Sequence, residues 1–108
     1  MQQGLNVWSQ SQHIGSLTVD QGRWQFTYSA AWLKGATSFP LSPYLPLDEV
    51  PFTDSADDKR VEWFFENLLP EGGMREAIAR KRNLQRRDIF GLLSNFGEEL
   101  AVGFLNLP

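Results

Sequence analysis

Residues 61–70 form the densest apolar stretch of the chain, and their spacing predicts an amphipathic helix. A strand does not fit, because strict alternation would bury Glu66 on the same face as Phe64. At helical spacing the apolar residues recur at i, i+3, i+4 and i+7 and form one stripe along the helix. This stripe consists of Val61, Phe64, Phe65, Leu68 and Leu69. We expect it to hold the helix against a sheet.

Trp63 belongs to the same helix but not to the stripe. At about 100° per residue, its side chain falls on the opposite side of the helix, near Glu66 and Asn67. Either another segment of the chain covers this indole, or a partner does. Because tryptophan is enriched at the energetic centres of protein interfaces, we expect a partner-binding surface around it. Its predicted members are Trp63, Glu62, Glu66, Asn67 and Pro70.

The first 28 residues show the period-two alternation that is typical of strands. We predict strands at residues 5–9, 14–19 and 23–28, and the third is the clearest because aromatic residues alternate with polar ones. Gly22 lies in the short link before the third strand, where it is free to adopt a positive φ. These short links predict an antiparallel meander.

The middle of the chain has weaker patterns. Residues 30–34 fit a single helical turn. Residues 39–47 contain three prolines, which exclude a helix and a central strand. We therefore expect an extended segment along a sheet edge, followed by an acidic loop at residues 48–54.

The helix that contains Trp63 is predicted to begin near Ser55, a suitable N-cap residue. Asp57 and Asp58 would then lie in its first turn, where the helix dipole favours acidic side chains. Pro70 is the predicted stop, because proline cannot continue a helix.

A second amphipathic helix is predicted at residues 74–82, with Met74, Ala77 and Ile78 along its inner side. A third is predicted at residues 88–96.

Asp88 is the expected N-cap of the third helix, and Gly97 its terminator. Residues 100–105 are predicted to form a strand that rejoins the sheet. The element order predicts an α+β fold, with a small, mainly antiparallel sheet and about three helices packed on one side. At this length we expect residues 1–108 to form a single domain.

Composition and charge narrow the function classes. The chain is 42% hydrophobic and carries a net charge of −3, which argues against general attraction to nucleic acid or acidic membranes. It has no cysteine, so disulfides, thiol nucleophiles and cysteine metal ligands are excluded. We see no signal-peptide pattern and no apolar run near the roughly 20 residues that span a membrane. These features suit a cytoplasmic protein.

The residues available for catalysis are few. His13 is the only histidine, and it lies in a predicted turn without placed partners, so a solvated surface role is expected. Zinc sites use about four ligands, and one histidine with scattered carboxylates does not supply them. Neighbouring carboxylates, as at residues 57–58, diverge along a regular element and do not make an acid–base pair. We therefore expect no enzymatic activity, no metal and no cofactor.

Six of the ten basic residues lie between positions 75 and 87. The candidate contact patch among them is Arg75, Arg80, Arg82, Arg86 and Arg87. A solvated helix face explains this cluster most simply, and an acidic patch on a protein partner also fits. A nucleic-acid site is a third option, but no aromatic residue interleaves the cluster as single-strand binding favours. We expect no direct contact with nucleic acid or membrane.

Several segments resemble the N-terminal subdomain of HipA-type toxin kinases. The specific element is Phe-Phe-Glu-Asn-Leu-Leu-Pro-Glu-Gly at residues 64–72. Weaker pieces are Ile-Gly-Ser-Leu at 14–17, Pro-Leu-Ser at 40–42 and the segment 88–97. The closing segment departs from the family, since Val-Gly at 102–103 stands where Gly-Ala is usual.

The resemblance implies a function that the residue patterns alone do not. In single-chain HipA kinases this subdomain precedes a kinase core, and none of that core's ATP-binding or catalytic residues occurs in this sequence. A stand-alone version resembles HipS, the small antitoxin of three-part HipBST systems. That likeness implies binding and neutralisation of a HipT-like serine/threonine kinase toxin near its active site, with a HipB-like helix-turn-helix protein in the complex.

Two other functions stay open. The chain could be the N-terminal regulatory subdomain of a single-chain HipA kinase. It could also be a module that contacts nucleic acid through residues 75–87.

Overall fold

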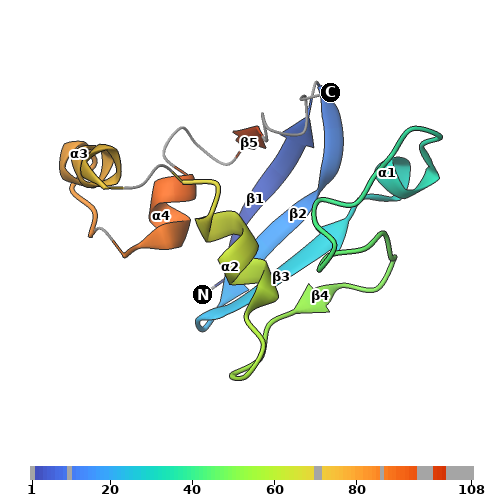
Figure 1. The fold of residues 1–108 in the computed structure, drawn as a ribbon, viewed down its shortest axis with the longest axis horizontal. Coiled ribbons are helices and arrows are strands. Elements are labelled where there is room, and N and C mark those ends of the chain that lie inside the picture. The colour runs from blue at the N-terminus through green and yellow to red at the C-terminus, as the bar shows by residue number, and fades with distance from the viewer. Residues whose placement is uncertain (1, 10, 70–71, 86, 95–98, 102–108) are drawn as a thin grey trace.

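The computed structural model describes residues 2–9, 11–69, 72–85, 87–94 and 99–101 of the chain. Five strands form one sheet in the order β4-β3-β2-β1-β5 (Figure 1). The strands are β1 (Gln2–Ser9), β2 (Gln12–Asp20), β3 (Arg23–Tyr28), β4 (Phe52–Thr53) and β5 (Glu99–Ala101). The helices are α1 (Ala30–Lys34), α2 (Arg60–Glu66), α3 (Gly73–Lys81) and α4 (Ile89–Leu93). The α+β class predicted from the sequence is confirmed.

The first three strands form the predicted antiparallel meander. Gln21 and Gly22 connect β2 to β3 with φ values of 52° and 79°, and a two-residue link with both φ positive matches the twist of a hairpin. β4 pairs with β3 in antiparallel orientation, whereas β5 pairs with β1 in parallel. The sheet is therefore mainly antiparallel, as expected.

One face of the sheet carries the core, and α2 and α4 lie over it (Figure 1). Phe65 of α2 packs against Phe26 of β3, with ring centroids 5.6 Å apart. Phe90 of α4 meets Trp24 of β3 edge to face at 5.8 Å. The apolar stripe predicted on α2 faces this core, with Val61 and Phe65 fully buried and Phe64, Leu68 and Leu69 packed against them.

The start of α2 differs from the prediction. The helix begins at Arg60, and Ser55 accepts a hydrogen bond from the Asp58 N–H at 3.1 Å in a turn before it. Asp54 supplies the cap from further away, because its carboxylate oxygens accept from the N–H groups of Val61 and Glu62, both at 2.9 Å. Asp58 and its neighbour therefore precede the helix rather than occupy its first turn. The predicted stop at residue 70 lies outside the described residues, and α2 ends at residue 66.

The sheet edge also differs from the prediction. The edge strand is β4, within the predicted acidic loop, and it pairs with Gln25 and Phe26 of β3. Residues 39–47 make only an isolated bridge between Ser42 and Leu45. Their prolines remove backbone donors that a paired edge would use. Instead of joining the sheet, this segment sends two leucines into the core.

The predicted inner side of α3 is wrong. Met74 is 65% exposed, whereas Ala79 is the buried residue of this helix. In Figure 1, α3 stands beyond α4 and away from the sheet. A helix in that position has little apolar surface to face, so its spacing pattern does not set its orientation.

The short helices match the prediction more closely. α1 spans the predicted residues 30–34, and Asp88 caps α4 by accepting from the Gly91 N–H at 3.0 Å. α4 ends at Leu93 with Ser94 as its C-cap, so it is shorter than the predicted helix, which continued to residue 96. The predicted terminator at residue 97 and the rest of the last strand after residue 101 lie outside the described residues. Within the described part of the chain, no helix is long and apolar enough to cross a bilayer.

Candidate functional site

Trp63 lies on the side of α2 turned away from the sheet, and 57% of it is exposed. Its nearest aromatic partner is Tyr44, which is 62% exposed. The two ring centroids are 6.3 Å apart and the planes stand at 88°, an edge-to-face arrangement. The sequence placed Trp63 on this side of the helix but indicated no role for Tyr44. Tyr44 belongs to residues 39–47, whose apolar positions follow neither a helical nor a strand period.

The turn that carries Tyr44 is anchored to the sheet through Tyr28. The buried Tyr28 hydroxyl accepts a hydrogen bond from the Leu41 N–H at 2.9 Å and donates one to the Leu45 carbonyl. Burial raises the pKa of this hydroxyl, although the Leu41 hydrogen bond acts in the opposite direction. The hydroxyl therefore stays protonated at neutral pH and keeps its role as a donor.

Arg60, the first residue of α2, joins the helix to the same turn. Its guanidinium donates to the Tyr44 carbonyl at 3.2 Å and to the Asp58 carboxylate at 2.6 Å. The hydrogen bond from Arg60 lowers the pKa of the Asp58 carboxyl, which lies at the surface. The turn and the helix start are thus linked on their solvent side as well as through the core.

The other predicted partner-binding residues of α2 share its exposed side. The Asn67 amide donates to the Trp63 carbonyl at 2.6 Å, which closes the end of the helix. Glu66 forms an ion pair with Arg75 at 3.6 Å, and Glu62 is half-buried. Pro70, the remaining member, lies outside the described residues.

The described members of the predicted basic patch differ in their exposure. The Arg75 side chain is only 14% exposed and lies against α2, where it pairs with Glu66. Arg80, Arg82 and Arg87 are exposed, and Arg86 lies outside the described residues. Arg75 therefore joins α3 to α2, whereas Arg80, Arg82 and Arg87 are exposed to solvent.

A groove of about 710 Å³ brings together residues from both predicted sets. Its walls are Glu62, Glu66, Arg75, Gln85, Arg87 and Ile89. Carboxylates from α2 and guanidinium groups from further along the chain supply both charge signs in one concave surface. Such a surface is suited to polar contacts with a protein segment.

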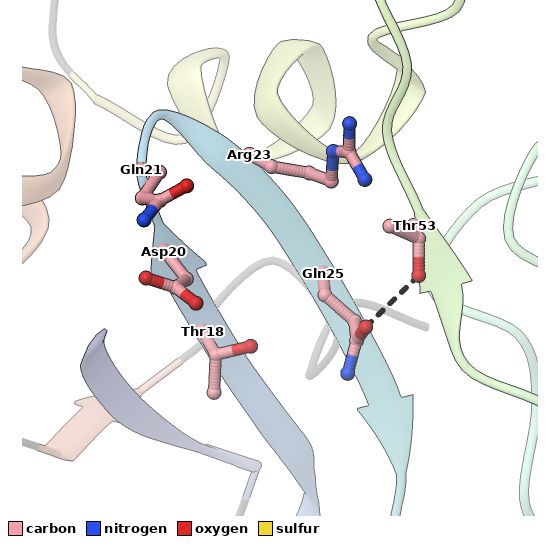
Figure 2. A pocket seen from close by; sticks show the side chains of 6 residues that line it. All are labelled: Thr18, Asp20, Gln21, Arg23, Gln25 and Thr53. Atoms are coloured by element: carbon pink, nitrogen blue, oxygen red, sulfur yellow. Dashed lines mark hydrogen bonds between the residues drawn. The ribbon is translucent and has the colours of Figure 1, made fainter. Parts of the chain in front are cut away.

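A second hollow, of about 350 Å³, lies on the opposite, polar face of the sheet (Figure 2). Figure 2 shows its lining from β2, the hairpin turn, β3 and β4, namely Thr18, Asp20, Gln21, Arg23, Gln25 and Thr53. The Thr53 hydroxyl donates to the Gln25 amide oxygen at 2.9 Å. The polar half of the strand alternation is the signal that could have located this face. Its hydroxyl and amide side chains, together with the charged side chains of Asp20 and Arg23, can bind a ligand through hydrogen bonds.

His13 lies within β2 rather than in the predicted turn. It is half-buried, and its ring centroid is 5.0 Å from that of Trp8. Its Nε2 atom is buried without a hydrogen-bond partner among the described residues. Across the same residues, no cluster of three or more histidine, aspartate or glutamate side chains could hold a metal ion.

Residues 5–107 match the family model of the HipA N-terminal domain. The chain belongs to the HipA N-terminal domain family. A curated relative from Sinorhizobium fredii, described as "Putative kinase Y4mE", is 34% identical over 105 residues. The aligned region covers 96% of this chain and 24% of the relative, so the chain spans about a quarter of that protein's length. The resemblance carried by residues 64–72 is thereby confirmed at the level of the family.

Within this HipA N-terminal domain, the family element and the exposed surface share one helix. The Phe-Phe positions of the element lie on the side of α2 that packs on the sheet, and its Leu-Leu positions pack against the same core just after the helix. Trp63 precedes the element and lies on the other side. The family pattern therefore accounts for how α2 is held but not for the tryptophan that it presents.

Proposed function

We propose that this chain is a non-enzymatic antitoxin that binds a HipT-like serine/threonine kinase toxin and neutralises it by contact near the active site. The observation that carries the proposal is the exposure of Trp63, 57%, on a helix that buries Val61 and Phe65 on its other side. Large aromatic side chains left exposed on a rigid support are typical of the centres of protein interfaces.

The kinase as partner is supported by the family. The relative described as a kinase contains a segment similar to this chain together with about three times as much further sequence. A domain of this family is thus part of a longer protein that is described as "Putative kinase Y4mE". In the proposed system the same pairing occurs between two chains, and a HipB-like helix-turn-helix protein completes the complex.

In this proposal the kinase is inhibited because Trp63 is inserted at or near its active-site cleft. A side chain of this size at or near the kinase cleft either excludes substrate or holds the two lobes in an unproductive arrangement. Glu62, Glu66 and Asn67 surround the tryptophan on α2 and supply the polar contacts at its margin.

The direct test is the variant Trp63→Ala in a kinase-inhibition and growth-rescue assay. The partner is the HipA-family kinase encoded by the reading frame adjacent to this one. We expect the variant to keep its circular dichroism spectrum and to bind at least about 30-fold more weakly, as loss of an interface hot spot predicts. Met74→Ala, an exposed apolar residue on α3, is the matched control. Full neutralisation by a folded Trp63→Ala protein would remove Trp63 as the anchor.

The relative also supports a second function, that of the N-terminal regulatory subdomain of a single-chain kinase. The two functions differ in how the kinase is encoded. A neighbouring kinase that begins without this domain and co-purifies with the chain supports the antitoxin. A kinase core continuous with this reading frame supports the regulatory subdomain.

A further inference from the structure

We propose that Tyr44 and Trp63 act together as one pre-positioned two-ring anchor, and that it fits an apolar pocket rimmed by basic side chains on the kinase. This inference rests on the proposed antitoxin function and adds both a second anchor residue and the chemistry of the surface that receives it.

The two rings come from different segments and meet at the surface. Trp63 belongs to α2 and Tyr44 to the turn at residues 41–45, yet their centroids lie 6.3 Å apart. Each is more than half exposed, so neither is covered by the described part of the chain. A perpendicular pair presents one ring face and one ring edge side by side, which is a shape that a single pocket can match.

The turn holds Tyr44 in place before any partner arrives. The Leu45 N–H donates to the Ser42 carbonyl at 2.9 Å, and the Tyr44 N–H donates to the Ser42 hydroxyl at 3.1 Å. Leu41 and Leu45 flank the turn and are buried. The Tyr28 hydroxyl ties both of these leucines to β3. Such a support lowers the entropy lost when the ring is immobilised in a complex.

Charge around the anchor indicates what receives it. Residues 48–69, the segment that carries Trp63, contain seven acidic and two basic side chains. Two of the acids are paired, Asp58 with Arg60 and Glu66 with Arg75 of α3, so an excess of acidic side chains remains. An aromatic pair in an acidic surrounding is complementary to an apolar pocket with a lysine- or arginine-rich rim. A second copy of this chain would fit poorly, because a symmetric contact would place the same acidic segments against each other.

The test measures affinity for the separately purified adjacent kinase, with Tyr44→Ala, Trp63→Ala and the double variant. We expect Tyr44→Ala to weaken binding about 10-fold or more, as expected for an interface residue that matters. The fold-loss of affinity in the double variant should be smaller than the product of the fold-losses in the two single variants, because the two rings act as a unit. Tyr44→Phe keeps the ring and should keep most of the affinity, while Met74→Ala should bind like the wild type.

Tyr28 is the positioning residue of this arrangement, and its role has its own readout. Tyr28→Phe should weaken binding in the wild-type background but cause little further loss when Tyr44 is already alanine. A purely structural role would lower the affinity equally in both backgrounds. Equal losses would therefore remove Tyr28 as the residue that positions Tyr44.

The basic rim is tested by salt. Affinity for the kinase should fall as the ionic strength rises from about 0.05 to 0.5 M, because exposed charge pairs are screened. An affinity that does not change would overturn the basic rim.

The remaining outcomes separate this inference from the proposed function. If the wild type does not bind the kinase, the proposed function itself fails. If the wild type neutralises the kinase and Tyr44→Ala does so with unchanged affinity, the function stands and the two-ring anchor is wrong. Self-association without kinase that is lost in Trp63→Ala would identify a second copy as the occupant and would also overturn the inference.

Discussion

The helices α2 and α3 carry similar sequence signals but hold very different places in the molecule. Both were predicted to be amphipathic. The outer side of α2 was predicted to bind a partner, whereas the basic residues on and after α3 were interpreted as a solvated face, with a contact patch as the alternative. α2 has fully buried residues against β3, and it is capped by Asp54 from the loop between β4 and α2. α3 buries only Ala79 and stands away from the sheet (Figure 1).

The difference shows what makes an exposed residue a good anchor. Trp63 and Met74 are exposed to similar extents, 57% and 65%. The tryptophan stands on a helix fixed by the core and beside a turn fixed by Tyr28. The methionine stands on a helix with few supports. Binding through α2 and Trp63 therefore loses less conformational entropy than binding through α3 and Met74 would.

The largest test of this contrast is the removal of one core ring. Phe65→Ala should lower the free energy of unfolding by about 3–5 kcal/mol, because the cavity lies against Phe26 of the sheet. Met74→Ala should change it by no more than about 0.5 kcal/mol, as for most exposed positions. Urea denaturation measures both values. Equal effects would mean that α3 is held as firmly as α2.

The cap of α2 gives a smaller and more local test. Asp54→Ala should cost about 1–2 kcal/mol of stability, because two N–H groups of the first turn lose their acceptor. Ser55→Ala should cost about 0.5 kcal/mol or less, since its hydroxyl serves a turn outside the helix. Denaturation of the two variants side by side decides which residue caps α2. A larger loss for Ser55→Ala would restore the earlier start of the helix.

The Tyr28 support predicts a dependence of stability on alkaline pH. Burial raises the pKa of this hydroxyl in the folded state, so the folded protein favours the protonated form. Its contribution to stability is complete below the unfolded pKa of about 10 and declines as the pH rises through the folded value. The stability difference between wild type and Tyr28→Phe should therefore shrink above pH ~10. A difference that stays constant across that range would exclude this linkage.

The smallest expected effect on stability concerns the ion pair between Arg75 of α3 and Glu66 of α2. Arg75→Ala should cost about 0.2–1 kcal/mol, because its partner Glu66 is partly exposed and the ion pair is 3.6 Å long. The double variant with Glu66→Gln should show weak coupling in a thermodynamic cycle. A coupling above about 2 kcal/mol would mean that α3 is docked to α2, which would weaken the contrast between them.

Sequence reasoning succeeded where the decisive interactions are close along the chain. The inner and outer sides of α2 follow from a helical period, so the burial of Phe65 and the place of Trp63 on the opposite side were both predictable. Whether another segment covers the indole does not follow from that period. The cap of α4 by Asp88 is also local. By contrast, the start of α2 depends on Asp54, which reaches seven residues forward and competes with a plausible local cap at Ser55.

The missed features depend on contacts between distant segments. β4 is two residues long and exists because Phe52 and Thr53 meet Gln25 and Phe26, a pairing that no local pattern encodes. Tyr44 is exposed because its neighbours on both sides are drawn into the core, although the segment has no strand or helix period. The outward side of α2 was therefore found, but half of the aromatic surface beside it was not.

The parallel pairing of β5 with β1 has a consequence during synthesis of the chain. Asn6, Val7 and Trp8 pair with residues 99–101, so β1 gains its second neighbour only after residue 101 has left the ribosome. Until then the meander can form, but β1 remains an open edge that other strands can join. Closing so long a loop is also slow compared with forming the hairpins. In pulse-labelled refolding, the amides between β2 and β3 should gain protection before those between β1 and β5, and the reverse order would contradict this sequence of events.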